Sequence, residues 1–226
     1  MTTQTETYLP FEIRDCALIS IATGNRAQNL KELRDRLLNV DSSSIYFHFW
    51  GALLRPGFES REYNNDFAEW IRHEIHDRTL AERLGVIDPS ATDDLEHLRS
   101  ELIDAIEERL DELRILFWTP PDRQFEFIRS QIIVFRTHRS IEKPEALKDI
   151  LPRLSASSVF YHFIDAGRRT EDRSDDFSAW LGQWGDEHDE LRRRLAGIDP
   201  YFISLTELRE QLSEIAADYF HQGAEV

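Results

Sequence analysis

The sequence predicts a mainly α protein, a tandem duplication of a roughly four-helix unit with pseudo-two-fold packing and room for short β segments at the start of each repeat. Two observations predict this class. Residues 11–52 align without a gap on residues 125–166, and 12 of these 42 positions are identical. Apolar residues also recur at helical spacing through most of both copies. Tandem copies of one helical unit commonly pack about an approximate two-fold axis.

The repeat predicts where the domains begin and end. Residues 1–10 form an N-terminal tail, 11–119 the first helical repeat, 120–124 a linker and 125–221 the second repeat. The linker opens with Pro120-Pro121, which cannot continue the long charged segment before it.

The opening segment of each repeat leaves two interpretations open. Residues 17–21 and 132–135 are β-branched enough for short strands, yet short enough to be buried helix. A first helix follows, behind a cap at Thr23 or Asn25 in one copy and behind Pro144 in the other. Its apolar positions are Leu30, Leu33, Leu37 and Leu38, repeated as Leu147, Ile150, Leu151 and Leu154.

Three further helices complete each repeat. Residues 45–54 are apolar on every side, which predicts a central helix that is buried all round. A third helix is expected from the cap region at residues 64–66 to Gly85, and from Asp175-Asp176 to Gly197 in the second copy. A fourth helix follows an Ile-Asp-Pro turn, with a capping box at Ser204 and Glu207 in the second copy.

Composition excludes several classes of function. With 41% hydrophobic and 31% charged residues, the chain is typical of soluble globular proteins, and it has no apolar run near the roughly 20 residues that span a bilayer. The single Cys16 and the absence of a signal peptide predict a reducing, cytoplasmic location. A net charge of -16 argues against nucleic-acid binding. No cofactor motif is present, so none is expected.

The clearest candidate site is a stripe along the central helix. Ser44, His48 and Ala52 are spaced i, i+4 and i+8, as are Ser158, His162 and Ala166, so each set lies on one face. Small residues on both sides of a histidine indicate close approach by another element. The first interpretation is a buried, hydrogen-bonded core histidine.

The alternative is a small polar ligand pocket around each histidine. Its members are Ser44, Tyr46, His48, Asp66 and Trp70 in one half, and Ser158, Tyr161, His162, Asp176 and Trp180 in the other. The two aspartates open helices, so capping is their expected role, and the tryptophans are expected to be core aromatics. A Ser-His-Asp hydrolase is disfavoured because nothing in the sequence supplies an oxyanion hole.

The third helix also carries a candidate metal site. Glu69, His73 and His76 have the spacing of ligands for a divalent metal. Gln183 and Asp186 stand at the two histidine positions in the second copy, and the face is otherwise polar. A solvated helix face is therefore the preferred interpretation.

Three ordered motifs carry a resemblance to a known family. They are Ser-Ile-Tyr-x-His-Phe-Trp, the run Tyr63-Asn64-Asn65-Asp66-Phe67-x-x-Trp70, and residues 80–89, with residues 21–24 before them. In these motifs the chain resembles an uncharacterised prokaryotic family of unknown function. The resemblance covers nearly the whole chain and implies a bacterial or archaeal soluble protein, without implying an activity, a cofactor or a catalytic residue.

The preferred function is a non-catalytic cytoplasmic interaction or regulatory module that binds a protein partner or a small molecule. It rests on the missing catalytic signatures. The alternative is a small-ligand sensor or an enzyme that uses a buried histidine, His48 or His162. The sequence leaves open whether the chain is a monomer or a homo-oligomer.

Overall fold

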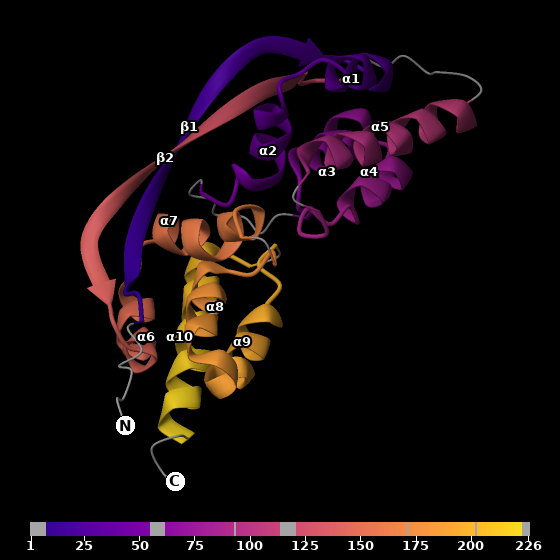
Figure 1. The fold of residues 1–226 in the computed structure, drawn as a ribbon. Helices are drawn as coiled ribbons and strands as arrows, with labels where there is room; N and C mark the ends of the chain where they lie inside the picture. Colours follow the sequence, from indigo (N-terminus) through magenta and orange to yellow (C-terminus); the bar gives the residue numbers. More distant parts are fainter. Residues whose placement is uncertain are drawn as a thin grey trace, which may run out of the picture. The chain divides into compact units, whose positions relative to one another are not determined.

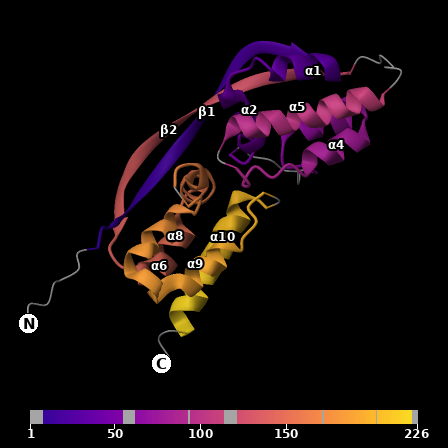
Figure 2. The ribbon, with the colours of Figure 1, turned by 45° about the vertical axis from the view of Figure 1, so that its right-hand side comes forward.

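The computed structural model describes residues 8–54, 62–92, 94–113, 121–170, 172–201 and 203–222. Two strands, β1 (Phe11–Ala27) and β2 (Phe125–Ile141), form one two-stranded antiparallel sheet. Figures 1 and 2 both show them side by side. Within the described part of the chain, no helix is both long and apolar enough to cross a bilayer.

The helices follow each strand in order. After β1 come α1 (Leu30–Leu37), α2 (Ser42–Trp50), α3 (Asp66–Trp70), α4 (Arg78–Gly85) and α5 (Leu95–Glu112). After β2 come α6 (Leu147–Ile150), α7 (Ala156–Val159), α8 (Asp176–Leu181), α9 (Asp189–Ala196) and α10 (Leu205–Gln222). Ile71–Ile75 and Phe160–Ile164 are π-helical turns, and Pro144–Ala146, Leu151–Arg153, Asp165–Arg168 and Gly182–His188 are 3₁₀ segments.

The expected mainly α class is wrong. The two segments that open the predicted repeats are strands of 17 residues each, so the arrangement mixes helices with a β ribbon and is not a tandem pair of all-helical units. The strands have weak sequence patterns for a physical reason. Most positions of both strands are exposed or only partly buried, so the apolar and polar alternation that marks a strand is confined to their starts.

The chain divides into two compact units. One contains Met1–Ala17 and Val134–Val226, with helices α6 to α10; the other is Leu18–Ile133, with helices α1 to α5. Each strand therefore begins in one unit and ends in the other. The start of β1 belongs with the helices that follow β2, and the start of β2 belongs with the helices that follow β1.

Each unit buries an apolar core between its helices and the start of one strand. In the α1–α5 unit the fully buried side chains include Leu33, Phe47, Phe67, Leu102 and Phe127. In the α6–α10 unit the buried set includes Ile13, Phe160, Phe177, Leu191 and Leu212. The predicted central helix over residues 45–54 is confirmed in part. Every residue from Ser44 to Trp50 of α2 is buried, but the helix ends at Trp50, and residues 52–54 beyond it are partly exposed.

The third helix of each predicted repeat is interrupted. Between α3 and α4 the chain reverses at His76, whose φ of 61° lies in the left-handed region. Between α8 and α9 it bends at Gly185, also at φ 61°. The expectation of one continuous helix to Gly85 and to Gly197 is therefore wrong. The fourth helices are confirmed as α5 and α10, and Ser204 and Glu207 form the expected capping box.

Candidate functional site

In the α6–α10 unit, a serine and a histidine one turn apart face the start of β1. Ser155 caps α7 by accepting the Ser158 backbone N–H at 3.0 Å, and α7 runs directly into the π turn that carries His162. His162 Nε2 accepts the backbone N–H of Arg14 at 2.9 Å, and its Nδ1 lies 2.7 Å from Asp176 Oδ2. Because Nε2 accepts a backbone N–H, the ring proton is assigned to Nδ1, which donates to Asp176.

The α1–α5 unit repeats these contacts on the start of β2. Asp41 caps α2, and His48 Nε2 accepts the backbone N–H of Ile128 at 3.1 Å. His48 Nδ1 lies 2.9 Å from Asp66 Oδ2. Both histidines are 3% exposed at the side chain. Each is therefore a neutral imidazole with both nitrogens in hydrogen bonds.

The serines bind the other backbone group of the same strand residue. Ser158 Oγ donates to the Arg14 carbonyl at 2.8 Å, and Ser44 Oγ donates to the Ile128 carbonyl at 2.8 Å. A serine and a histidine at i and i+4 thus satisfy both the N–H and the C=O of one residue, as a neighbouring strand would. We call each Ser–His–Asp set with its strand residue a strand clamp.

The tryptophans hold the chain just before each strand. Trp180 Nε1 donates to the Leu9 carbonyl at 2.7 Å, and Trp70 Nε1 donates to the Arg123 carbonyl at 2.7 Å. Phe11 lies between the tryptophan and the histidine, 4.9 Å from the His162 ring and 5.5 Å from the Trp180 ring. Phe125 lies 4.7 Å from His48 and 5.7 Å from Trp70.

The aspartates have a different role from the one expected. Capping of α3 and α8 is done by the preceding residues, Asn65 and Asp175, which accept the N–H of Ala68 and Ser178. The expectation that Asp66 and Asp176 cap these helices is therefore wrong. Each is the first residue inside its helix, and its carboxylate binds the histidine instead. Burial raises the pKa of Asp175, although hydrogen bonds from Ser178 oppose this shift.

The two candidate tyrosines have different surroundings. Tyr46 is buried and stacks on Trp50 at 4.9 Å. Tyr161 instead lies under the guanidinium of Arg169, which is 4.0 Å from its ring. Ala166 is fully buried, whereas Ala52 is partly exposed. The two stripes therefore differ at their alanine.

Arg169 is a site residue that sequence reasoning missed. Its guanidinium donates to Asp165 Oδ2 at 3.0 Å, to Asp176 Oδ2 at 3.1 Å and to the Tyr161 carbonyl at 2.6 Å. Burial lowers the pKa of Arg169, but the hydrogen bond to Asp176 and the neighbouring carboxylates outweigh it, so the net shift is upward. No sequence pattern marks this pairing, because Arg169 stands among several other charged residues.

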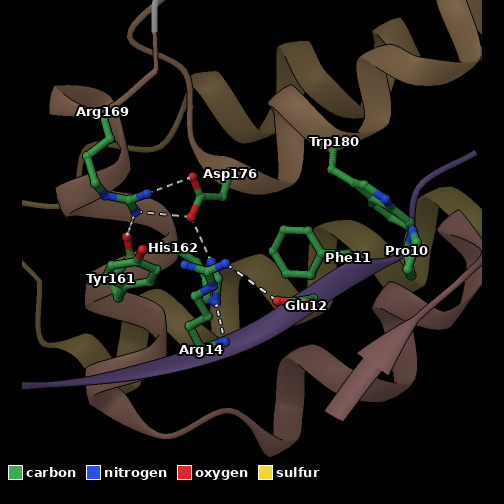
Figure 3. A pocket seen from close by; sticks show the side chains of 9 residues that line it. All are labelled: Pro10, Phe11, Glu12, Arg14, Tyr161, His162, Arg169, Asp176 and Trp180. Atoms are coloured by element: carbon green, nitrogen blue, oxygen red, sulfur yellow. Dashed lines mark hydrogen bonds and ion pairs between the residues drawn. The ribbon is translucent and has the colours of Figure 1, made fainter. Parts of the chain in front are cut away.

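A hollow of about 430 Å³ opens beside the clamp of the α6–α10 unit (Figure 3). On the strand side it is lined by Pro10, Phe11, Glu12 and Arg14. On the helical side it is lined by Tyr161, His162, Arg169, Asp176 and Trp180. Glu12 and Arg14 are 51% and 42% exposed at the side chain, and a 3.4 Å contact joins them.

The third-helix histidines are not drawn together with a metal-binding geometry. His73 Nε2 lies 3.3 Å from Glu69 and 3.5 Å from Glu62, while His76 occupies the reversal after the π turn. Among the described residues there is no group of three or more His, Cys, Asp or Glu placed to hold a metal ion. The geometry favours an exposed polar face.

Comparison with known proteins places the chain in a family. No curated protein matches it. A solved structure described as that of OrfY from Thermoproteus tenax matches with a TM-score of 0.79 and 25% identity, over 95% of this chain and 97% of that one. The model of a family of unknown function, DUF5752, matches residues 8–217. The chain therefore belongs to the family of unknown function DUF5752.

Proposed function

We propose that this chain is a non-catalytic cytoplasmic interaction or regulatory module, in which the two strand clamps hold β1 and β2 in place. The observation that carries the proposal is that both ring nitrogens of His48 and of His162 are hydrogen-bonded within the chain. A general base must have a free lone pair within reach of the proton that it removes. Here that lone pair accepts a backbone N–H.

The serines support the same interpretation. A hydrolytic serine donates its hydroxyl proton to the histidine that activates it. Ser44 and Ser158 donate theirs to strand carbonyls instead. The arrangement thus resembles a triad in residue types, but the serine hydroxyl donates to the backbone and not to the histidine. The acidic chain, with a net charge of -16, would present its polar faces to a protein partner or a small ligand.

The test replaces each histidine and measures folding and ligand response together. We expect His48→Leu and His162→Leu each to lower the free energy of unfolding by about 2–5 kcal/mol, because a strand N–H loses its acceptor and an aspartate loses its hydrogen bond to the histidine. His73→Leu is the control; its side chain is 57% exposed, so its effect should stay within about 0.5 kcal/mol.

A thermal-shift screen against metabolites and metals accompanies these variants. A histidine variant that keeps the wild-type melting temperature, but loses stabilisation by a compound that stabilises the wild type, would contradict the proposal. That result would support the alternative, a sensor or an enzyme acting through His48 or His162.

A further inference from the structure

We infer that the hollow beside the clamp of the α6–α10 unit binds a free α-amino acid with an apolar side chain. The inference goes beyond the proposed function and does not depend on it, because the clamp histidine keeps its structural hydrogen bonds when the hollow is filled. It rests on the charged pair Glu12 and Arg14, on the charge balance of the lining, and on its apolar side chains.

Glu12 and Arg14 offer both halves of a zwitterion site. They are two residues apart on β1, so their side chains leave the same face of the strand. Their mutual contact at 3.4 Å is long, and about half of each side chain is exposed. The guanidinium has five N–H donors, so most remain available for a carboxylate, and Glu12 can accept from an ammonium group.

The other charged groups of the lining are already engaged. Arg169 donates to Asp165, Asp176 and the Tyr161 carbonyl, and Asp176 also accepts from His162. These residues form a fixed polar wall. Figure 3 shows the side chains of Glu12 and Arg14 beside these residues. Their charged groups are the ones left for a ligand to pair with.

Charge balance favours a zwitterion over an ion of one sign. The lining holds two arginines and two carboxylates, and His162 is neutral in its assigned hydrogen bonds. The net charge of -16 on the whole chain repels free anions, and a simple cation would find many other carboxylates. A zwitterion has no net charge and pairs with both groups.

The apolar part of the lining selects the side chain. Pro10, Phe11 and Trp180 supply the apolar side chains of the lining. Its volume of about 430 Å³ falls within the roughly 300–1,000 Å³ of small-molecule sites. Burial of an aliphatic or aromatic side chain there adds affinity that glycine cannot gain.

The other clamp provides an internal comparison. Ile128 stands where the first clamp has Arg14, so no guanidinium is available at that position. Glu126, which corresponds to Glu12, pairs with Arg26 at 3.1 Å. One ligand per chain is therefore expected.

The experiment is isothermal titration calorimetry of the whole chain with L-phenylalanine and L-leucine. We expect one site per chain. Glycine, 3-phenylpropionate and L-phenylalanine methyl ester, which lack the side chain, the ammonium and the free carboxylate respectively, should each bind about tenfold more weakly or not at all.

Arg14→Gln and Glu12→Gln should each weaken L-phenylalanine binding about tenfold or more, because each removes a charged hydrogen bond. Glu126→Gln is the matched control and should bind as the wild type does.

Three results would overturn the inference. The first is no binding of either amino acid at millimolar concentration. The second is 3-phenylpropionate binding as tightly as L-phenylalanine, which would indicate a carboxylate site only. The third is unchanged affinity in both Arg14→Gln and Glu12→Gln. Circular dichroism checks that the variants fold, which is expected since both side chains are half exposed and the Arg14 backbone remains in the clamp.

Discussion

A single strand residue in each unit has both of its backbone groups bound by side chains of a helix. Arg14 gives its N–H to His162 and accepts from Ser158; Ile128 does the same with His48 and Ser44. The spacing of serine and histidine in the sequence indicated close approach of another element at this face. That element is a strand that lies far away in the sequence. A local sequence pattern cannot identify such a distant partner.

Cys16 is a second residue whose behaviour follows from its surroundings. Its Sγ lies 3.4 Å from the Ser157 carbonyl, and it is 4% exposed. Burial, together with the nearby carboxylates of Asp15 and Asp165, raises the pKa of the thiol from 9.0 to about 12. The thiolate is the reactive form, so native Cys16 should be inert at neutral pH.

Two measurements check this prediction. Reaction with a disulfide reagent at pH 8 should be slow in the native protein and fast in denaturant. Since the folded pKa lies above the unfolded one, the contribution to stability is complete below about pH 9 and is lost as the pH rises toward 12. Cys16→Ala should flatten that alkaline decline. Rapid native labelling at pH 8, or an unchanged decline in Cys16→Ala, would contradict the assigned environment.

At the scale of the element, the two strands share an unusual backbone conformation near their ends. Gly24 in β1 has a φ of 77° and His138 in β2 has a φ of 57°, and the two occupy corresponding positions of the aligned sequence segments. Left-handed conformation suits glycine and is costly for a residue with a Cβ.

We expect Gly24→Ala to lower the free energy of unfolding by about 1 kcal/mol. An added Cβ at Gly24 meets no atom within 4 Å, so the cost is conformational and not steric. His138→Gly should be neutral or stabilising, because relief of the left-handed cost offsets the greater freedom of glycine in the unfolded chain. Denaturant melts of both variants measure these effects.

Arg139→Gly is the matched control for the second strand. Its φ is not positive, so glycine there should only destabilise, by about 0.5–1 kcal/mol. A loss of stability in His138→Gly equal to that in Arg139→Gly would show that the left-handed conformation is not strained at His138.

At the scale of the whole molecule, each compact unit is completed by the start of a strand from the other half of the sequence. The helices α1 to α5 bury Phe125 and Phe127 from the start of β2, while the helices α6 to α10 bury Phe11 and Ile13 from the start of β1. Neither sequence half therefore contains all of the residues that complete its own helical core.

Because each core needs residues from both halves of the sequence, we predict that neither half folds alone. Fragments 1–121 and 122–226 should each show low helicity and no cooperative melting alone, and should regain both when mixed in equal amounts. The physical reason is that each helical core lacks its phenylalanines and its strand clamp partner until the other fragment arrives. Circular dichroism and size-exclusion chromatography measure the recovery.

A variant fragment supplies the control. Fragment 122–226 with Phe125→Ala and Phe127→Ala removes buried groups of the α1–α5 unit only. Mixed with fragment 1–121, it should restore the α6–α10 unit and leave the other unit unfolded. Full native signals from either isolated fragment as a monomer would contradict the prediction.

The sequence by itself determined several local features. A run that is apolar on every side located α2, apolar spacing located α5 and α10, and the capping box at Ser204 was confirmed. Repetition of Ser44, His48, Asp66 and Trp70 at corresponding positions marked the residues that meet at each clamp. Such features are encoded within a few turns of helix, where neighbours in sequence are neighbours in space.

Tertiary structure alone decided the rest. The long strands escaped prediction because a ribbon exposed over most of its length carries little apolar alternation. Glu12, Arg14 and Arg169 line the hollow only because β1 starts against helices more than 140 residues later in the chain. Contacts at that separation depend on how cores are completed by distant segments, a property that no local sequence pattern contains.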